Sequence, residues 1–493
     1  MGLKFGSRRQ RPDQRFQSAS DTEKQPVPAD IGQCETELKK IFGKSSDIVI
    51  QRFMTRKGEA LFICVDGMSN KDLIDRDILA PLKAETFDGD IAYAMNAAYQ
   101  MTDDLFEAIR EVLSGNTALF YKNEEKAFII DFKQWDNRSV EVPEAEAVIR
   151  GPKEGFVENI RTNTSLLRRK IKTPKLIIES LVLGKQTNTS IALAYVEGIV
   201  NTEALEIVRA RLAEINTDAI LETGYIEQYL ERRTFSLISS FGLTQKPDVL
   251  AARILEGRIG ILCDGTPHAL TVPHLFIENL QSAEDYYSRT PKGIYFRLFR
   301  LFALFISLYL PGMFLAVGTY HHEMVPGVFL STIISAIEKT PLPLGAEIFF
   351  LGTMFELLRE SGTRLPKAIG PAISIVGALI IGEAAVNAGI VSAPVVIVVA
   401  LTAVCSFVNS SLNEFMMAYR YIFLFAGGTM GLIGIASVTM IMLSQIASSD
   451  SFGGSTLSTY TREDLRDNPL RLPLWSMKFR PSSIAGENKR RQK

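Results

Sequence analysis

The spacing of hydrophobic residues divides the 493-residue chain into two regions. Up to about residue 290, short apolar runs alternate with polar and charged segments, which is typical of a soluble fold with its own core. After Arg297 the apolar runs become much longer and almost uncharged. Because a bilayer span needs about 20 apolar residues, the pattern predicts an α/β region followed by an all-α polytopic membrane domain.

The region before residue 150 is predicted to contain strands, one helix and a hairpin. Asp47–Phe53 and Ala60–Val65 are strand-like, and the second is nearly all apolar, which indicates a strand buried on both faces. Ile91–Leu113 has helical spacing. Ala118–Tyr121 and Ala127–Phe132 flank a short polar turn, so we expect them to pair as a hairpin.

The same order of predicted elements recurs further along the chain. Ile191–Val196 is a predicted strand, Thr202–Ile215 a helix, and Arg258–Leu262 with His268–Val272 a hairpin. A basic segment at about 150–180 is predicted to be a helix that links the two parts.

Two local matches support an internal duplication. VDGMSNKDL at Val65–Leu73 resembles VEGIVNTEAL at Val196–Leu205, and LSGNTALF at Leu113–Phe120 resembles LEGRIGIL at Leu255–Leu262. The shared glycines are expected to form a turn after the strand and a helix C-cap. The sequence therefore predicts two related small α/β subdomains. The acid-Gly turns could bind a ligand, but no phosphate loop accompanies them, so plain turns are favoured.

The membrane region is predicted to hold four to six helices. Four apolar runs are long enough to span a bilayer: Leu298–Tyr320, Ala368–Asn387, Val391–Val408 and Tyr421–Leu443. Two shorter runs are Val325–Ile337 and Leu344–Leu358, the second interrupted by Glu347 and Glu356. At this length each could be a tilted span, a re-entrant piece or an interfacial helix.

Charge indicates how the chain is oriented. Arg297 and Arg300 at the start of the first span, and the basic tail Ser444–Lys493, favour the cytoplasmic side. If the N-terminal region and the tail both lie on the cytoplasmic side, the number of spans must be even, four or six. The basic cluster Arg359, Arg364 and Lys367 leaves this number open. The predicted division is a disordered polar leader without a signal peptide (1–34), a first subdomain (35–149), a linking helix and second subdomain (150–290), a membrane domain (291–446) and a cytoplasmic tail (447–493).

The clearest candidate functional residue is an acid within the second long apolar run. Ile373, Val376, Ile380 and Glu383 share one helical face. Around a symmetry axis they would form apolar rings followed by an acidic ring, the parts of a hydrophobic gate and a cation-attracting mouth. From the residues alone, an ordinary helix–helix interface is favoured, with Glu383 reaching the membrane surface or paired with another side chain.

Other candidates concern packing and contact. Gly427 and Gly431 form a GxxxG pair, which indicates close helix packing. The basic segment that contains Arg161, Arg168, Arg169 and Lys170 is either a solvated helix face or a contact with lipid or a subunit.

Composition argues against several other functions. A net charge of −1 gives no case for nucleic-acid binding. The four scattered cysteines are expected to be buried thiols rather than metal ligands. We find no catalytic motif and expect no enzyme activity, cofactor or metal site, including at His321–Glu323.

Three long segments have a distinctive sequence. They are RGPKEGFVENIRTNTSLLRRKIKTPKLIIE at Arg150–Glu179, GRIGILCDGTPHALTVPHLFIENLQSAEDYY at Gly257–Tyr287, and EIFFLGTMFELLRESGTRLPKAIGPAISIVGALIIGEAAVNAGIVSAP at Glu347–Pro394. All three resemble hallmark stretches of the A subunits of GerA-type spore germination receptors. The resemblance covers nearly the whole chain and leaves out only the leader and the extreme tail.

The resemblance implies a multi-pass protein of the endospore inner membrane that responds to nutrients. It implies a transporter-like B subunit and a lipoprotein C subunit as partners, and a homo-oligomer that forms an ion channel. It therefore favours pore lining by Ile373, Val376, Ile380 and Glu383, and a subunit contact at the basic segment. The alternatives are a secondary transporter, which would typically show paired membrane halves, and a membrane-anchored scaffold without a pore.

Overall fold

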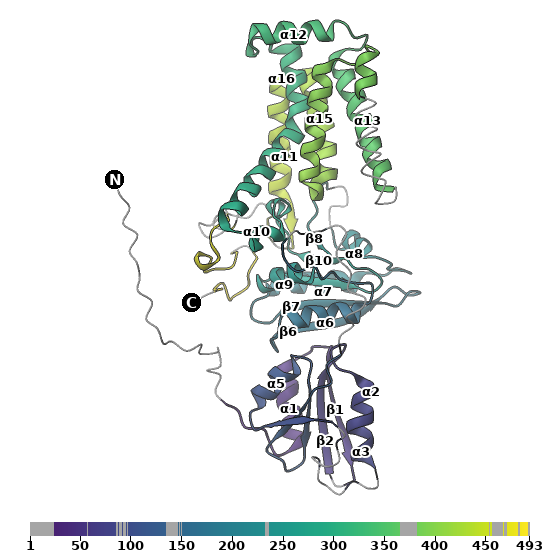
Figure 1. Cartoon of the computed structure of the whole chain (residues 1–493), viewed down its shortest axis with the longest axis vertical. Coiled ribbons are helices and arrows are strands. Elements are labelled where there is room, and N and C mark those ends of the chain that lie inside the picture. Colours follow the sequence, from purple (N-terminus) through teal and green to yellow (C-terminus); the bar gives the residue numbers. More distant parts are fainter. Residues whose placement is uncertain are drawn as a thin grey trace, which may run out of the picture. The chain divides into compact units, whose positions relative to one another are not determined.

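The structure is a computed structural model of the chain (Figure 1). It describes residues 24–56, 58–84, 97–134, 150–231, 236–364, 382–452, 454–455, 471–481 and 484–491, together with residues 87, 91, 95, 146, 148 and 467. The described residues divide between two compact units, the first drawn from the ranges 1–137 and 171–177 and the second from the ranges 138–170 and 178–493.

The first unit is built on a five-stranded antiparallel sheet in the order β1-β2-β4-β5-β3. The strands are β1 (Ile48–Thr55), β2 (Gly58–Val65), β3 (Tyr99–Thr102), β4 (Thr117–Tyr121) and β5 (Ala127–Ile130). The helices are α1 (Ile31–Phe42), α2 (Lys71–Ile74), α3 (Ala80–Lys83) and α5 (Leu105–Val112), with the π-helical turn η1 (Asp75–Leu79) between α2 and α3.

Strand β2 is buried on both faces, as its apolar composition predicts. Leu61 and Ile63 face a core that includes side chains of α1 and α5. Phe62 and Cys64 face the opposite core, which includes side chains of η1 and α3. Side chains alternate across a strand, so a strand that is apolar at every position needs a helical layer on each side.

The helix predicted over Ile91–Leu113 is wrong over much of its length. Tyr99–Thr102 forms edge strand β3, which pairs with β5, and α5 begins only at Leu105. The side chain of Asp104 accepts a hydrogen bond from the backbone of Phe106 and caps the helix. Pairing at the sheet edge makes Tyr99–Thr102 a strand, and the cap starts the helix at Leu105, although the residues before it have helical spacing.

The second unit contains a sheet of the same design, in the order β6-β7-β9-β10-β8. Its strands are β6 (Leu176–Leu183), β7 (Thr189–Val196), β8 (Gly242–Thr244), β9 (Ile259–Cys263) and β10 (Ala269–Val272). Its helices are α6 (Ile160–Lys170), α7 (Thr202–Glu214), α8 (Thr223–Leu230) and α9 (Pro247–Leu255). Residues 150–180 are therefore not one linking helix, because α6 ends at Lys170 and an edge strand follows.

The two sheets repeat each other in strand order and in turn chemistry. Asn70 caps α2 and Asn201 caps α7, each accepting two backbone hydrogen bonds through its side chain. Gly67 and Gly198, in the turns just before these caps, have φ angles of 80° and 78°, a region that favours glycine. The fold prediction of two related α/β subdomains followed by a helical domain is confirmed.

The helical domain follows the second sheet through the short turns η2 (Phe276–Leu280) and α10 (Ala283–Tyr287). Its elements are α11 (Thr290–Tyr320), η3 (His322–Met324), α12 (Gly327–Ile337), α13 (Leu344–Arg364), α15 (Ala393–Val408), η4 (Ser410–Leu412) and α16 (Asn413–Ser448). Among the described residues, Thr290–Tyr320 and Ser410–Ser448 are long and apolar enough to cross a membrane, and Ala393–Val408 is a shorter apolar helix. Most of the predicted span Ala368–Asn387 lies outside the described residues.

Helix α16 reverses direction at Gly431. This residue has φ 62° and ψ −142°, which is not helical. The hydroxyl of Tyr419 donates to the side chain of Gln445, although 26 residues of straight helix would separate them by about 39 Å. Residues 413–430 and 432–448 are therefore two antiparallel arms, and the single span predicted over Tyr421–Leu443 is wrong. Periodicity continues through the turn, so only the glycine marks the reversal.

Both ends of the helical domain lie beside the second subdomain. α11 begins directly after α10, and the second arm of α16 leads to Phe452, whose ring packs edge-on against Phe241 at 5.2 Å between centroids. The strands β11 (Asp450–Ser451) and β12 (Gly454–Ser455) and the turn η6 (Leu474–Ser476) follow. Further on, Ile484 is fully buried, and the backbone of Gly486 donates to the carbonyl of Ile199. The described part of the tail is therefore docked on the second subdomain.

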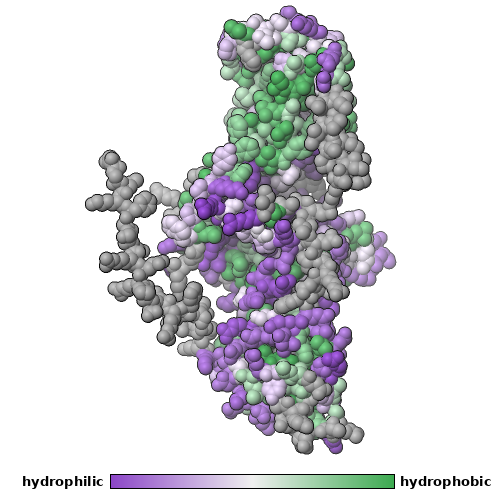
Figure 2. Space-filling view, viewed as in Figure 1, coloured by the Kyte–Doolittle hydropathy of each residue, from purple (hydrophilic) through white to green (hydrophobic). Residues whose placement is uncertain are grey.

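The outer surface of the helices is strongly apolar. Figure 2 shows hydrophobic residues covering the visible face of the helical domain, in contrast with the polar surface of the sheets. Phe425, Ile433 and Met440 are 73–74% exposed. Apolar patches of this kind mark a membrane or a protein interface.

Candidate functional site

A cluster of charged side chains is buried inside the helical domain. Glu356 and Arg359 lie on α13, and Arg420 lies on the first arm of α16. The Arg420 Nη1 is 2.8 Å from Glu356 Oε1, and the Arg359 Nη2 is 2.5 Å from Glu356 Oε2. Only 8% of the Arg420 side chain and 11% of the Glu356 side chain are exposed. One carboxylate thus faces two guanidinium groups, which gives the cluster a net charge of +1.

A proline explains why Arg420 also contacts α11. Pro311 lies inside α11 and has no N–H, so the carbonyl of Ser307 four residues earlier loses its helical partner. Arg420 Nε donates to that carbonyl at 3.2 Å. An unsatisfied buried carbonyl is costly, and the arginine removes that cost. Arg420 consequently ties α11, α13 and α16 together.

The cluster borders a small cavity of about 20 Å³. Pro311, Phe355, Val399 and Thr402 are among its lining residues, so α15 also contributes to it. Within the described part of the chain, the Nη2 of Arg420 is buried without a hydrogen-bond partner. A cavity of this size can hold one water molecule.

Glycines allow the helices around the cluster to approach closely. A Cβ atom built on Gly427 would lie 2.5 Å from the carbonyl oxygen of Gly312, and one on Gly312 would lie 2.7 Å from the carbonyl oxygen of Phe423. Gly427 therefore lies directly against α11. Gly431 has a different role, since it forms the reversal of α16 and faces His321.

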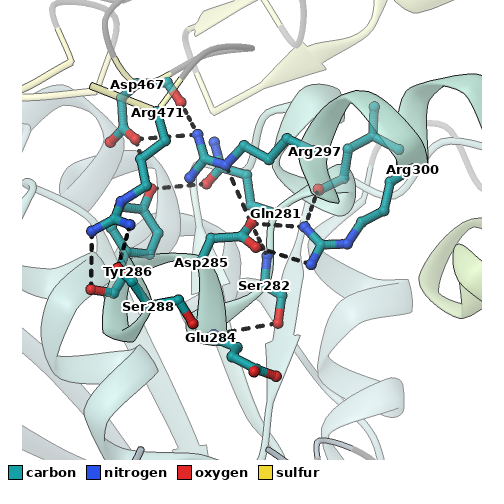
Figure 3. A network of polar contacts seen from close by, with 11 residues as sticks. Gln281, Ser282, Glu284, Asp285, Tyr286, Ser288, Arg297, Arg300, Asp467 and Arg471 are labelled. Atoms are coloured by element: carbon teal, nitrogen blue, oxygen red, sulfur yellow. Dashed lines mark hydrogen bonds and ion pairs between the residues drawn. The ribbon is translucent and has the colours of Figure 1, made fainter. Parts of the chain in front are cut away.

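A second charged network lies where α11 leaves the second subdomain (Figure 3). Arg300 makes a bidentate contact with Asp285, at 2.7 and 3.0 Å. Arg297 Nε lies 3.2 Å from the same carboxylate, and its Nη1 donates to the backbone of Asp467. These arginines, which the charge pattern places at the cytoplasmic start of the first span, are largely buried. They face inwards and bind α10 and the tail.

The tail closes this network around an aromatic ring. The Tyr286 ring lies between the guanidinium groups of Arg297 and Arg471, 5.1 and 5.6 Å from its centroid. The Tyr286 hydroxyl donates to Asp467 at 2.9 Å, and Arg471 donates to the carbonyls of Ser288 and Tyr286. Burial raises the pKa of Asp467, with a smaller contribution from Glu256. The network joins the base of α11 to the tail.

Of the predicted pore-lining residues, Ile373, Val376 and Ile380 lie outside the described residues. Glu383 is described, in a helical segment over residues 382–387, and its side chain is exposed. The neighbouring Gly382 faces α15, where a Cβ atom would meet Val396 at 3.6 Å.

The predicted contact residues on α6 differ in exposure. Arg168 is completely buried. Arg169 and Lys170 pair with Glu154 at 3.4 and 2.7 Å. Arg161 and Lys170 are exposed residues.

Sequence reasoning overlooked Arg420, Asp285 and Asp467. Arg420 is the cation between the apolar runs FMMAY and YIFLF, and that isolation was a signal that could have been used. Nothing in the sequence links Asp467 to α11. Among the described residues, no group of three or more His, Cys, Asp or Glu side chains is placed to hold a metal ion. All four cysteines are free and buried, as predicted.

Comparisons with known proteins agree with the resemblance seen in the sequence. A profile of the family described as "Bacillus/Clostridium GerA spore germination protein" matches residues 36–483. Spore germination protein KA of Bacillus subtilis (strain 168) is 37% identical, over 92% of this chain and 87% of the relative. Spore germination protein GerLA of Bacillus cereus is 32% identical, over 91% of this chain and 94% of the relative.

A membrane protein and a solved domain structure are also similar to this chain. The uncharacterized membrane protein YfkQ of Bacillus subtilis (strain 168) is 34% identical, over 96% of this chain and 95% of the relative. The crystal structure of the N-terminal domain of the A subunit of the Bacillus megaterium spore germinant receptor GerK3 is 28% identical, covering 51% of this chain and 98% of that chain with a TM-score of 0.39. The family match and the similarity to several germination proteins extend over most of the sequence, and the chain therefore belongs to the GerA family of spore germination proteins.

Proposed function

We propose that this chain is the membrane-spanning A subunit of a nutrient-responsive germination receptor and that several copies form a gated ion channel. It works with a transporter-like B subunit and a lipoprotein C subunit in the inner membrane of the endospore. The α/β subdomains and the tail lie on the spore-core side. The protein binds no nucleic acid and catalyses no reaction.

The position of Glu383 carries the channel proposal. Its side chain is exposed on an apolar helical domain, whereas the preceding Gly382 faces the neighbouring helix α15. Six residues later, Gly389 lies near the carbonyl of Lys339 at the end of the bundle away from the second subdomain, so Glu383 is about 9 Å from that end. A carboxylate at this depth is costly in lipid and must face protein or water. A water-filled path shared between copies provides that environment.

The described segments favour six spans. Helices α11, α13 and α15 and the two arms of α16 run along the bundle, and both ends of the domain lie beside the second subdomain. The span predicted over Ala368–Asn387, most of which lies outside the described residues, would bring the number to six. Ile373, Val376 and Ile380 belong to this predicted span and, with Glu383, are proposed to line the path.

The test is ion flux through purified full-length protein in liposomes, together with the size of the assembly in detergent. We expect an oligomer that conducts cations, and we expect Glu383→Gln to reduce cation selectivity because it removes the charge near the mouth. Glu338→Gln is the matched control, since Glu338 is an exposed C-cap residue of α12 at the same end.

The possible outcomes separate the alternatives. Equal effects of the two variants would contradict pore lining by Glu383. A monomer with saturable uptake would indicate a carrier, and a protein without flux or uptake would indicate a scaffold.

A second test replaces Val376 or Ile380 with Ala or Ser, which we expect to cause leaky ion release. Unchanged ion retention in both variants would contradict the proposed gate.

A further inference from the structure

Helix α8 carries an aromatic face that no described part of the chain covers. Tyr225 and Tyr229 are 44% and 50% exposed and lie four residues apart, on one face of the helix. Leu221, just before the N-cap residue of α8, is 61% exposed, and Leu237 in the following loop is 44% exposed. By contrast, Ile226 on the opposite face is fully buried.

The loop after α8 fixes this face at the base of the helical domain. Ile238 is buried in the same hydrophobic cluster as Leu304 of α11 and Ile446 of α16. The cluster also contains Leu280 and Leu412, which lie just before α11 and α16, and it extends along α11 to Ala316. Leu237, next to Ile238, is therefore adjacent to the apolar interior of the helical domain.

Two hydrogen bonds hold α8 to this loop. Glu227 accepts a hydrogen bond from the Ser239 hydroxyl at 2.6 Å, and Glu231 accepts one from the backbone N–H of Ser240 at 2.9 Å. The acids of the helix are thus turned towards the loop. Figure 1 shows α8 and β8 on the side of the second sheet nearest to the helices.

We propose that the exposed face of α8 lies in the interfacial layer of the lipid bilayer. Leu237 lies between this face and the apolar helical domain, and the carboxylates of Glu227 on α8 and Glu414 on α16 lie near the same junction. Tyrosine prefers this layer because its ring is apolar and its hydroxyl can reach water. The occupant is lipid rather than a second copy of the chain. This inference depends on the proposal that the helices span a membrane.

The experiment measures the depth of single tryptophans in full-length protein in neutral liposomes. Trp135→Phe and Trp475→Phe provide a background without the two native tryptophans. Tyr225→Trp and Leu237→Trp are then introduced separately, and lipids brominated near the top of the acyl chain act as quenchers. We expect loss of emission and a shift of its maximum to shorter wavelength for both.

Two control positions make the result interpretable. Phe425→Trp, at a position 74% exposed on α16, reports whether the helices are in lipid. Val182→Trp, at a position 59% exposed on β6, reports a soluble surface and is expected to escape quenching. If Phe425→Trp is quenched but Tyr225→Trp and Leu237→Trp emit as in water, the inference about α8 is wrong and the membrane proposal stands.

Two further outcomes would overturn the inference. If the α8 tryptophans escape lipid quenching but are quenched by added copies that carry a quencher, a second copy occupies the face. If Phe425→Trp itself is not quenched, the membrane proposal fails, and the inference fails with it. Quenching of both α8 positions together with Phe425→Trp, and not of Val182→Trp, supports it.

Discussion

Glu356 is the residue on which the buried charge cluster depends most. Its carboxylate is the counter-charge that contacts both Arg359 and Arg420, whereas either arginine can be lost without leaving the carboxylate unpaired. Removing one partner of a buried ion pair costs about 3–5 kcal/mol. We therefore expect Glu356→Gln to lower the free energy of unfolding by this amount, since it leaves two guanidinium groups without a counter-charge.

Arg420→Met is expected to cost less. Glu356 keeps Arg359 as a partner, and the main loss is the hydrogen bond to the carbonyl of Ser307. Leaving a buried acceptor unsatisfied costs about 1–3 kcal/mol. The double variant with Glu356→Gln and Arg420→Met should lose less stability than the two single losses added together. We expect the difference to be about 0.5–3 kcal/mol, because the two substituted groups interact directly.

The assay is unfolding of the full-length protein in dodecyl maltoside micelles by added dodecyl sulfate, followed by intrinsic fluorescence. Glu360→Gln is the matched control on the same helix: its ion pair with Arg364 is exposed, with side chains 62% and 78% accessible. A pair of this kind contributes less than about 1 kcal/mol. The reasoning fails if Arg420→Met destabilises the protein as much as Glu356→Gln, or if Glu356→Gln behaves like the control.

Three more predictions concern other parts of the molecule. Gly427→Leu is expected to separate α16 from α11, because a Cβ atom would lie 2.5 Å from the carbonyl oxygen of Gly312. The yield of disulfide cross-linking between cysteines introduced into the two helices should then fall, and an unchanged yield would contradict the contact. Burial disfavours the charged form of Glu278, but the charge of Arg258 and the hydrogen bond from His274 have a larger effect and lower the pKa of Glu278 to about 2. Because the folded pKa lies below the unfolded value, its contribution is full at pH 7 and is lost as pH falls from about 4.3 towards 2; hydrogen exchange in β9 and β10 should rise over this range, and Glu278→Gln should abolish that dependence. Burial raises the pKa of the Cys263 thiol to about 12, so we expect a maleimide to react with it only after unfolding, and rapid labelling of native protein would refute this.

In the α/β region, the sequence alone was sufficient to predict those elements whose conformation depends mainly on their own residues. Strand β2 and the β4–β5 hairpin follow from apolar runs and a polar turn. The duplication was visible because turn residues repeat: Asn70 and Asn201 cap equivalent helices. Cap and turn chemistry is local, so it can be read from the residues themselves.

The errors arose where a distant partner determines the conformation. Strand β3 is an edge strand that exists because β5 offers it hydrogen bonds, and β6 pairs in the same way in the second sheet. The reversal of α16 is stabilised by contacts between its arms, such as that of Tyr419 with Gln445. Apolar periodicity is the same in a straight helix and in two folded arms, so the sequence could not distinguish them.

The sequence by itself therefore determined the two α/β subdomains, the helical domain after them and the family to which the chain belongs. Only the tertiary structure decided which charges meet. Arg420 and Glu356 are separated by 64 residues, and Arg297 and Asp467 by 170. Buried charges are stable only when paired and hydrogen-bonded, and a pairing between remote segments is set by the packing of helices, which a linear pattern does not encode.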